Sequence, residues 1–212
     1  MNAFWGYADT YGCAIPLVFL MVRKRKLSLE EKTLTWYLIF SIIIFGFSNY
    51  LADHGTNNHF LYHLFADVEF FFIAIYFSLV IRNTLVKKII PYVIAGLIIF
   101  SVLNVLVLHE SLTSWPTNTF FVEFFMIIVL CFVYFFELTS SNDILQFYKV
   151  ESFWVIAGFF IYYSLSFSIV ILYKYVAEYS SVFVYRFWIL QIMFYLLKNV
   201  LIGVGFLCRP TR

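Results

Sequence analysis

The stretch that decides the fold is FLYHLFADVEFFFIAIYFSLVI, residues 60–81, which is mostly aliphatic or aromatic. A helix of about 20 apolar residues crosses the roughly 30 Å hydrocarbon core of a bilayer, so this stretch predicts a membrane-spanning helix. Glu69 interrupts the stretch near its centre. An ionisable side chain at that depth is costly unless it finds a partner, so Glu69 is a candidate functional residue.

The composition of the whole chain agrees with this interpretation. Of its 212 residues, 63% are hydrophobic and 12% are charged, whereas about a quarter of the residues are charged in soluble domains. We therefore expect an integral membrane protein with lipid around it. The net charge of +2 and the absence of nucleotide-binding or nucleic-acid motifs give no reason to expect a nucleic-acid partner.

Six further apolar runs accompany the first one. Together they predict one all-α domain over residues 1–212, a polytopic bundle of seven transmembrane helices with no large soluble part. We expect spans at roughly 4–22, 35–53, 60–81, 89–108, 119–137, 153–173 and 183–207.

The basic residues between the spans predict the orientation, because cytoplasmic loops are enriched in Lys and Arg. Eleven of them fall on one side of the predicted membrane: Arg23, Lys24, Arg25, Lys26, Lys32, Arg82, Lys87, Lys88, Lys149, Arg209 and Arg212. The other side has Lys174 and Arg186. This bias places the N-terminus outside and the C-terminus in the cytoplasm. The cluster at 23–26 follows the first apolar run, so we expect that run to be a retained helix.

Polar residues line one face of the third predicted span. Spacing of three or four residues places the following on that face: His59, Tyr62, His63, Ala66, Glu69, Ile73 and Tyr76. Such a stripe is expected to line a polar cavity that holds a ligand or a proton. The alternative is a protonated Glu69 that only bonds to a neighbouring helix.

The last predicted span carries a second polar stripe, made of Gln191, Tyr195 and Lys198. A Glu69–Lys198 ion pair is a hypothesis that the sequence leaves open; water or Tyr195 would have to bridge the two, because their predicted depths differ by about 5 Å or more. Glu123 in the fifth span and Asp9 in the first are further ionisable candidates.

All four histidines fall on the predicted outer side. His59 and His63 are one helical turn apart, a spacing that can chelate zinc, and His54 and His109 are candidates to complete a site. The alternative is that these histidines are simply solvated at the membrane interface. This pattern makes zinc the candidate cofactor.

Three stretches carry a family resemblance: NHFLYHLFADVEFFFIAIYF (58–77), SFWVIAGFFIYYSLSFSIVIL (152–172) and LKNVLIGVGFLC (197–208). They resemble a family of uncharacterised bacterial seven-helix membrane proteins, often encoded beside sensor histidine kinases. The matching positions are Glu69-Phe70, Phe153-Trp154 with Gly158 and Tyr162, and Gly205-Phe206. The resemblance implies a multi-pass protein of the bacterial inner (plasma) membrane with a kinase or effector as partner.

These observations favour a membrane sensor or accessory protein that works through a partner, with a second copy of the chain as another admissible partner. A channel, transporter or pore-forming accessory, for example in a defence system, is the first alternative. A metal-dependent intramembrane hydrolase using the outer histidines is the second; it is similar in outline to alkaline ceramidases, but spans 5 to 7 contain no histidine. Lys198 matches retinal proteins in position only. No enzymatic motif is present, so catalysis is not expected.

Overall fold

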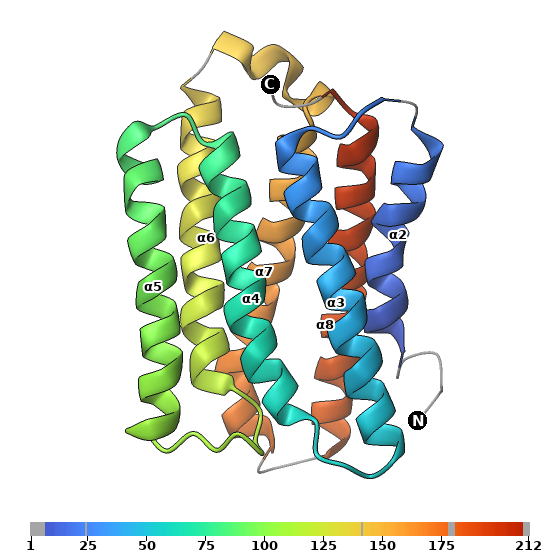
Figure 1. The fold of residues 1–212 in the computed structure, drawn as a ribbon, viewed down its shortest axis with the longest axis vertical. Coiled ribbons are helices and arrows are strands. Elements are labelled where there is room, and N and C mark those ends of the chain that lie inside the picture. Colours follow the sequence, from blue (N-terminus) through green and yellow to red (C-terminus); the bar gives the residue numbers. More distant parts are fainter. Residues whose placement is uncertain (1–6, 24, 141, 178–180, 210–212) are drawn as a thin grey trace.

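The computed structural model describes residues 7–23, 25–140, 142–177 and 181–209. These residues form seven α-helices and one short 3-10 helix, without a β-strand. The elements, drawn in Figure 1, are α2 (Ala8–Val22), α3 (Leu29–Asp53), α4 (His59–Val80), α5 (Thr84–Leu106), α6 (Thr117–Thr139), η1 (Asn142–Lys149), α7 (Glu151–Ala177) and α8 (Ser181–Leu207).

The expectation of an all-helical membrane-compatible bundle is confirmed. Six helices, α3 to α8, are long and apolar enough to cross a membrane. The remaining helix, α2, has 15 residues and so extends over about 22 Å, less than the roughly 30 Å of a hydrocarbon core. Residues 4–6, the start of the first expected span, lie outside the described residues.

Two helices begin earlier than expected because polar residues cap them. α3 begins at Leu29 instead of residue 35, since Ser28 and Glu31 form a capping box in which each side chain bonds the other residue's backbone N–H. α5 begins at Thr84 instead of residue 89, since the side chain of Asn83 accepts hydrogen bonds from the first turn. The other described helix ends lie within a few residues of the expected positions.

Six of the helices close into a ring, and α5 packs outside it. Around the ring the neighbours are α2, α3, α4, α6, α7 and α8, and α8 returns to α2. α5 contacts α4 and α6 and is the least buried of the six long helices (Figure 1). The core between the helices is strongly aromatic; for example, the Phe45 and Phe65 ring centroids lie 4.7 Å apart. This arrangement brings α3, α4 and α8 together around the bundle interior.

The two ends of the bundle differ in character. Residues 25–28, residues 81–83 and η1 lie at one end, the top of Figure 1, which we call the basic end. Residues 54–58 and 107–116 lie at the opposite end, which we call the histidine end. At the histidine end the Tyr7 hydroxyl donates a hydrogen bond to Asp53, and this bond to a negative carboxylate raises the pKa of Tyr7.

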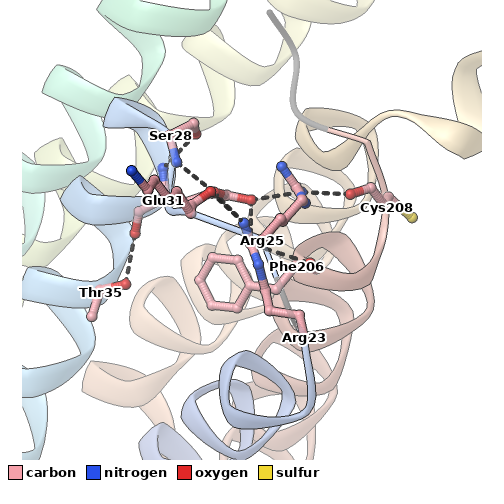
Figure 2. Close-up of polar contacts among 8 residues, drawn as sticks. Arg23, Arg25, Ser28, Glu31, Thr35, Phe206 and Cys208 are labelled. Atoms are coloured by element: carbon pink, nitrogen blue, oxygen red, sulfur yellow. Dashed lines mark hydrogen bonds and ion pairs between the residues drawn. The ribbon is translucent and has the colours of Figure 1, made fainter.

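A buried ion-pair network ties the ring together at the basic end. Arg23 and Arg25 both donate to the carboxylate of Glu31, which is fully buried, and Arg25 does so at 2.8 Å (Figure 2). The same two arginines donate to backbone carbonyls at the end of α8, Arg23 to Phe206 at 3.3 Å and Arg25 to Cys208 at 2.6 Å. The basic turn predicted from topology therefore also joins the first described helices to the last one.

Candidate functional site

The polar stripe of α4 faces the interior of the bundle, as its spacing predicted. Glu69 and Tyr76 are almost completely buried, and so is His63 nearer the histidine end. Tyr62 and His59 are partly buried. The apolar neighbours on the same face, Ala66 and Ile73, are also buried against other helices, so this face is the one that the bundle encloses.

Glu69 and Lys198 pair in the centre of the bundle. The Lys198 Nζ lies 3.7 Å from Glu69 Oε1, and both side chains are almost fully buried. Tyr37 of α3 bridges them: its hydroxyl donates to Glu69 Oε1 at 2.6 Å and accepts from Lys198 Nζ at 2.8 Å. The expected bridge through Tyr195 is wrong, because the Tyr195 hydroxyl bonds the Cys13 sulfur of α2 instead.

Tyrosine rings surround the Lys198 ammonium. Its Nζ lies 4.4 Å from the ring centroid of Tyr195 and 4.5 Å from that of Tyr162. The centroids of Tyr37 and Tyr163 follow at 5.3 Å and 5.6 Å. An aromatic face attracts a cation within about 6 Å, and the attraction grows when water is excluded. These rings therefore help to hold a positive charge where bulk water cannot.

A second carboxyl group lies beside this pair. Glu123 of α6 is fully buried, and its carboxyl lies close enough to Glu69 to interact with it. It interacts electrostatically with Glu69 most strongly, then with Asp67, and it is also attracted by Lys198. One ammonium balances one carboxylate, so the Glu69–Glu123–Lys198 group has a deficit of one positive charge when both carboxyls are ionised.

A cavity of about 100 Å³ connects this group toward the histidine end. Asp9 of α2, Glu69, Gln191 and Tyr62 supply its polar lining. The remaining lining residues are aromatic except for Ile192: Phe45, Phe65, Trp115, Phe120, Phe124, Tyr162, Trp188 and Tyr195. The expected cavity around Glu69 is therefore present as a space, and residues from six helices and one loop enclose it.

The candidate residues do not all meet in this cavity. The cavity is lined by four of them: Glu69, Tyr62, Gln191 and Tyr195. Lys198 lies behind this lining, where it contacts Glu69 and Tyr195. Tyr76 lies two turns further toward the basic end, where it interacts electrostatically with Glu151, Glu30 and Glu31. Its hydroxyl has no hydrogen-bonding partner in the described part of the chain.

The histidines do not assemble into a metal site. The described residues contain no group of three or more His, Cys, Asp or Glu side chains that could hold a metal ion. His54 is exposed and bonds the Tyr50 carbonyl at 2.8 Å, whereas buried His63 bonds the Ser114 carbonyl at 3.2 Å. His109 is exposed and has a positive φ of 59°. His59 packs edge-on against Trp115 at the mouth of the cavity.

Sequence reasoning did not place Tyr37, Tyr162 and Tyr163 beside Lys198, which they contact directly, although Tyr162 was among the family-resemblance positions. Periodicity places a residue on a face of its own helix, but it does not say which face of another helix lies opposite. Glu31 was also missed, although the capping-box spacing Ser28-x-x-Glu31 was a signal that could have found it.

Comparison of the chain with protein-family models, with curated proteins and with solved structures gives no match, so the function has to be argued from this site alone.

Proposed function

We propose that the protein is a multi-pass membrane sensor or accessory protein, in which the charge state of the Glu69–Glu123–Lys198 group controls how the helices pack. The observation that carries this proposal is the cavity that reaches Glu69, a buried carboxyl that pairs with buried Lys198 and lies beside buried Glu123. A group of this kind has two states, because one proton or cation changes its net charge by one in a medium of low dielectric constant.

The proposed topology has seven spans, with α2 as the first. α2 lies alongside α8 and ends at the basic end, so its direction matches that of a span that enters from outside. The basic residues predicted to be cytoplasmic fall at that same end, apart from Lys24 and Arg212, which lie outside the described residues. By the positive-inside rule the basic end faces the cytoplasm and the cavity faces outward, in the plasma membrane of a bacterium.

A kinase or effector partner at the cytoplasmic end is part of the proposal, because a membrane bundle has to pass its state on to a protein that can act on it. The described basic end offers the means of coupling, since Glu31 ties α3 to the end of α8, and α3 and α8 also supply Tyr37 and Lys198. A change in the charge of the Glu69–Glu123–Lys198 group can thus alter the positions of α3 and α8 relative to each other at the basic end.

The test measures that coupling. Spin labels on Lys32→Cys and Lys149→Cys, both exposed at the basic end, are introduced after replacement of the native cysteines, and the distance between them is measured in nanodiscs from pH 8 to pH 5. We expect the distance distribution to change with pH and the change to disappear in Glu69→Gln and in Glu123→Gln. Asp53→Asn, outside the cavity, is the matched control.

A pH-independent distance in the parent protein, or an unchanged pH response in both variants, would contradict the proposal. Circular dichroism of each variant confirms that its helices remain folded. Co-purification with a kinase or effector, followed by loss of the effector's response in Glu69→Gln, tests the role of the partner.

Proton transport is a second candidate function, because buried hydroxyls continue from Lys198 toward the basic end. Tyr163 and Tyr76 have unpartnered hydroxyls among the described residues, and Tyr76 interacts with Glu151. Phe159, however, packs between them, with ring centroids 6.0 Å from Tyr163 and 6.2 Å from Tyr76. This apolar break favours the sensor, and proton flux into liposomes that Glu69→Gln abolishes would favour the transporter.

A further inference from the structure

The cavity above Glu69 has the walls of a cation site. Of its 13 lining residues, nine carry an aromatic ring, and two carry a carboxyl group, Asp9 and Glu69. Lys198 does not line the cavity, but it pairs with Glu69 from behind the lining, so Asp9 is the lining carboxyl that has no basic partner among the described residues. Aromatic faces together with carboxylates are the surroundings in which proteins bind organic ammonium groups.

The site already holds one ammonium in this way. Tyr162 and Tyr195, whose rings lie closest to the Lys198 Nζ at 4.5 Å and 4.4 Å, also line the cavity. These two rings therefore separate the lysine from the cavity, and each has a second surface for contact. A ligand ammonium in the cavity would share the same rings and would lie on the side of Glu69 away from the lysine.

The interior is rich in carboxyl groups. Glu69 and Glu123 share Lys198 as a basic neighbour, Asp67 lies near Glu123, and Asp9 lines the cavity nearer the histidine end, so positive charge is short when these carboxyls are ionised. A bound monocation supplies the missing positive charge, as a proton would. Among the described residues no basic side chain bonds Asp9: its Oδ1 accepts from the backbone N–H of Thr10 at 2.7 Å and from Asn49 at 3.4 Å.

The size and polarity of the space restrict the class of cation. A cavity of about 150 Å³ holds a benzene ring, so about 100 Å³ suits a compact cation of about five heavy atoms. Ca²⁺ requires six to eight oxygen ligands and Mg²⁺ an octahedral set. The carboxyl and amide oxygens here come from three side chains only, Asp9, Glu69 and Gln191.

We propose that this cavity binds a small organic monocation of the alkylammonium class, held by the aromatic rings and by the carboxylates of Asp9 and Glu69. This inference rests on the proposed sensor function and names its ligand class. The cation enters from the histidine end, past Trp115 and Trp188, and completes the charge balance of the Glu69–Glu123–Lys198 group.

Tryptophan fluorescence provides the test, because Trp115 and Trp188 line the cavity. Purified full-length protein in nanodiscs is titrated with tetramethylammonium chloride and with ethylammonium chloride at constant ionic strength. We expect a saturable change that is reduced in Trp115→Phe and Trp188→Phe. tert-Butanol, similar in shape to tetramethylammonium but neutral, and sodium chloride are the matched ligand controls and should give no saturable change.

Single substitutions measure how much each carboxylate contributes to binding. Glu69→Gln and Asp9→Asn should each weaken binding by about tenfold or more, since each removes one charge-assisted contact. Asp53→Asn, a carboxyl at the same end that does not line the cavity, should leave the affinity unchanged. Asp9→Asn keeps the test informative if Glu69→Gln proves unstable by circular dichroism.

Binding of tert-butanol as tight as that of the ammonium ions would overturn the cation assignment. Wild-type affinity in both Asp9→Asn and Glu69→Gln, with Glu69→Gln shown to be folded, would overturn it as well. Absence of saturable binding by both ammonium ions would also overturn it. The sensor proposal fails separately, on the pH-dependent distances across the basic end. A protein that responds to pH but binds no ammonium retains the first proposal and loses the second.

Discussion

Gly158 of α7 lies against the main chain of Lys198 in α8. A methyl group added at Gly158 would lie 3.1 Å from the Lys198 carbonyl oxygen and 3.2 Å from the Cβ of Leu201. Small residues allow helices in a membrane to approach this closely. Because both contacts are with the turn that carries Lys198, the spacing of α7 and α8 sets the position of the ammonium relative to Glu69.

Substitution of Gly158 tests this control of position. Gly158→Ala should destabilise the protein by about 1–3 kcal/mol, the usual cost of overpacking, and Gly158→Val should cost more. Unfolding in SDS, followed by circular dichroism, measures the change. Gly46→Ala and Gly96→Ala are matched controls, since no atom lies within 4 Å of a methyl group at either helical position. Equal effects at all three glycines would contradict the prediction.

The Glu69–Lys198 pair should show strong non-additivity. Glu69→Gln and Lys198→Met each leave the other group buried without its partner, and each should cost about 3–5 kcal/mol. The double variant removes both charges and should cost less than the sum of the two single costs. A double-mutant cycle of unfolding free energies measures the coupling, and strictly additive costs would mean that the pair contributes no coupling to the folded state.

Tyr37→Phe should destabilise the protein although it removes only one hydroxyl. That hydroxyl bonds both Glu69 and Lys198, so its loss leaves two buried charges each short of a hydrogen bond. We expect a cost of about 1–3 kcal/mol in the same unfolding assay. Tyr92→Phe in α5 removes an exposed hydroxyl and should change the free energy of unfolding by less than about 0.5 kcal/mol. Similar costs for the two variants would rule out a bridging role for Tyr37.

Glu31→Gln should loosen the basic end. The change leaves Arg23 and Arg25 without the carboxylate that they share, and Arg23 is itself almost completely buried. We expect destabilisation by about 3–5 kcal/mol and faster proteolysis of the turn at 23–28. Lys32→Gln, at an exposed neighbouring position, is the control. Unchanged protease resistance in Glu31→Gln would show that the network does not hold this end together.

The Cys208 thiol should react slowly at neutral pH. Burial raises the pKa of Cys208, and the nearby Glu151 carboxyl raises it further. The thiolate is the reactive form, so the rate of maleimide labelling should rise about tenfold per pH unit and continue to rise beyond the ordinary thiol pKa of about 8.5. Cys13 and Cys131 are buried and should not label in the folded protein. A rate that levels off below pH 8 would contradict the raised pKa.

The helices and the inward face of α4 were predictable because they depend on neighbours within one helix. Glu69 is buried together with Ala66, three positions before it, and Ile73, four positions after it, as a period of 3.6 predicts for one face. The sequence made a Glu69–Lys198 pair plausible, since two opposite charges in a bilayer have few other ways to be balanced, but it did not establish that the two residues meet.

The bridging residue was not predictable, because Tyr37 is 161 residues from Lys198 and belongs to a third helix. Which residue bridges the pair depends on how α3 lies between α2 and α4. The periodicity of a single helix does not encode that position. The start of α3 was misjudged for a different reason: charged residues at 30–32 look like a loop by hydropathy, whereas Glu31 is buried by its two arginines.

The contact between α2 and α8 has a consequence for the order in which the protein is made. α2 leaves the ribosome first among the described helices, yet it packs more extensively on α8 than on α3. With only 15 residues and Pro16 inside, it is poorly suited to remain stable alone. The main packing partner of α2 is therefore made only after five other α-helices, and completion of α8 closes the ring in a single late step.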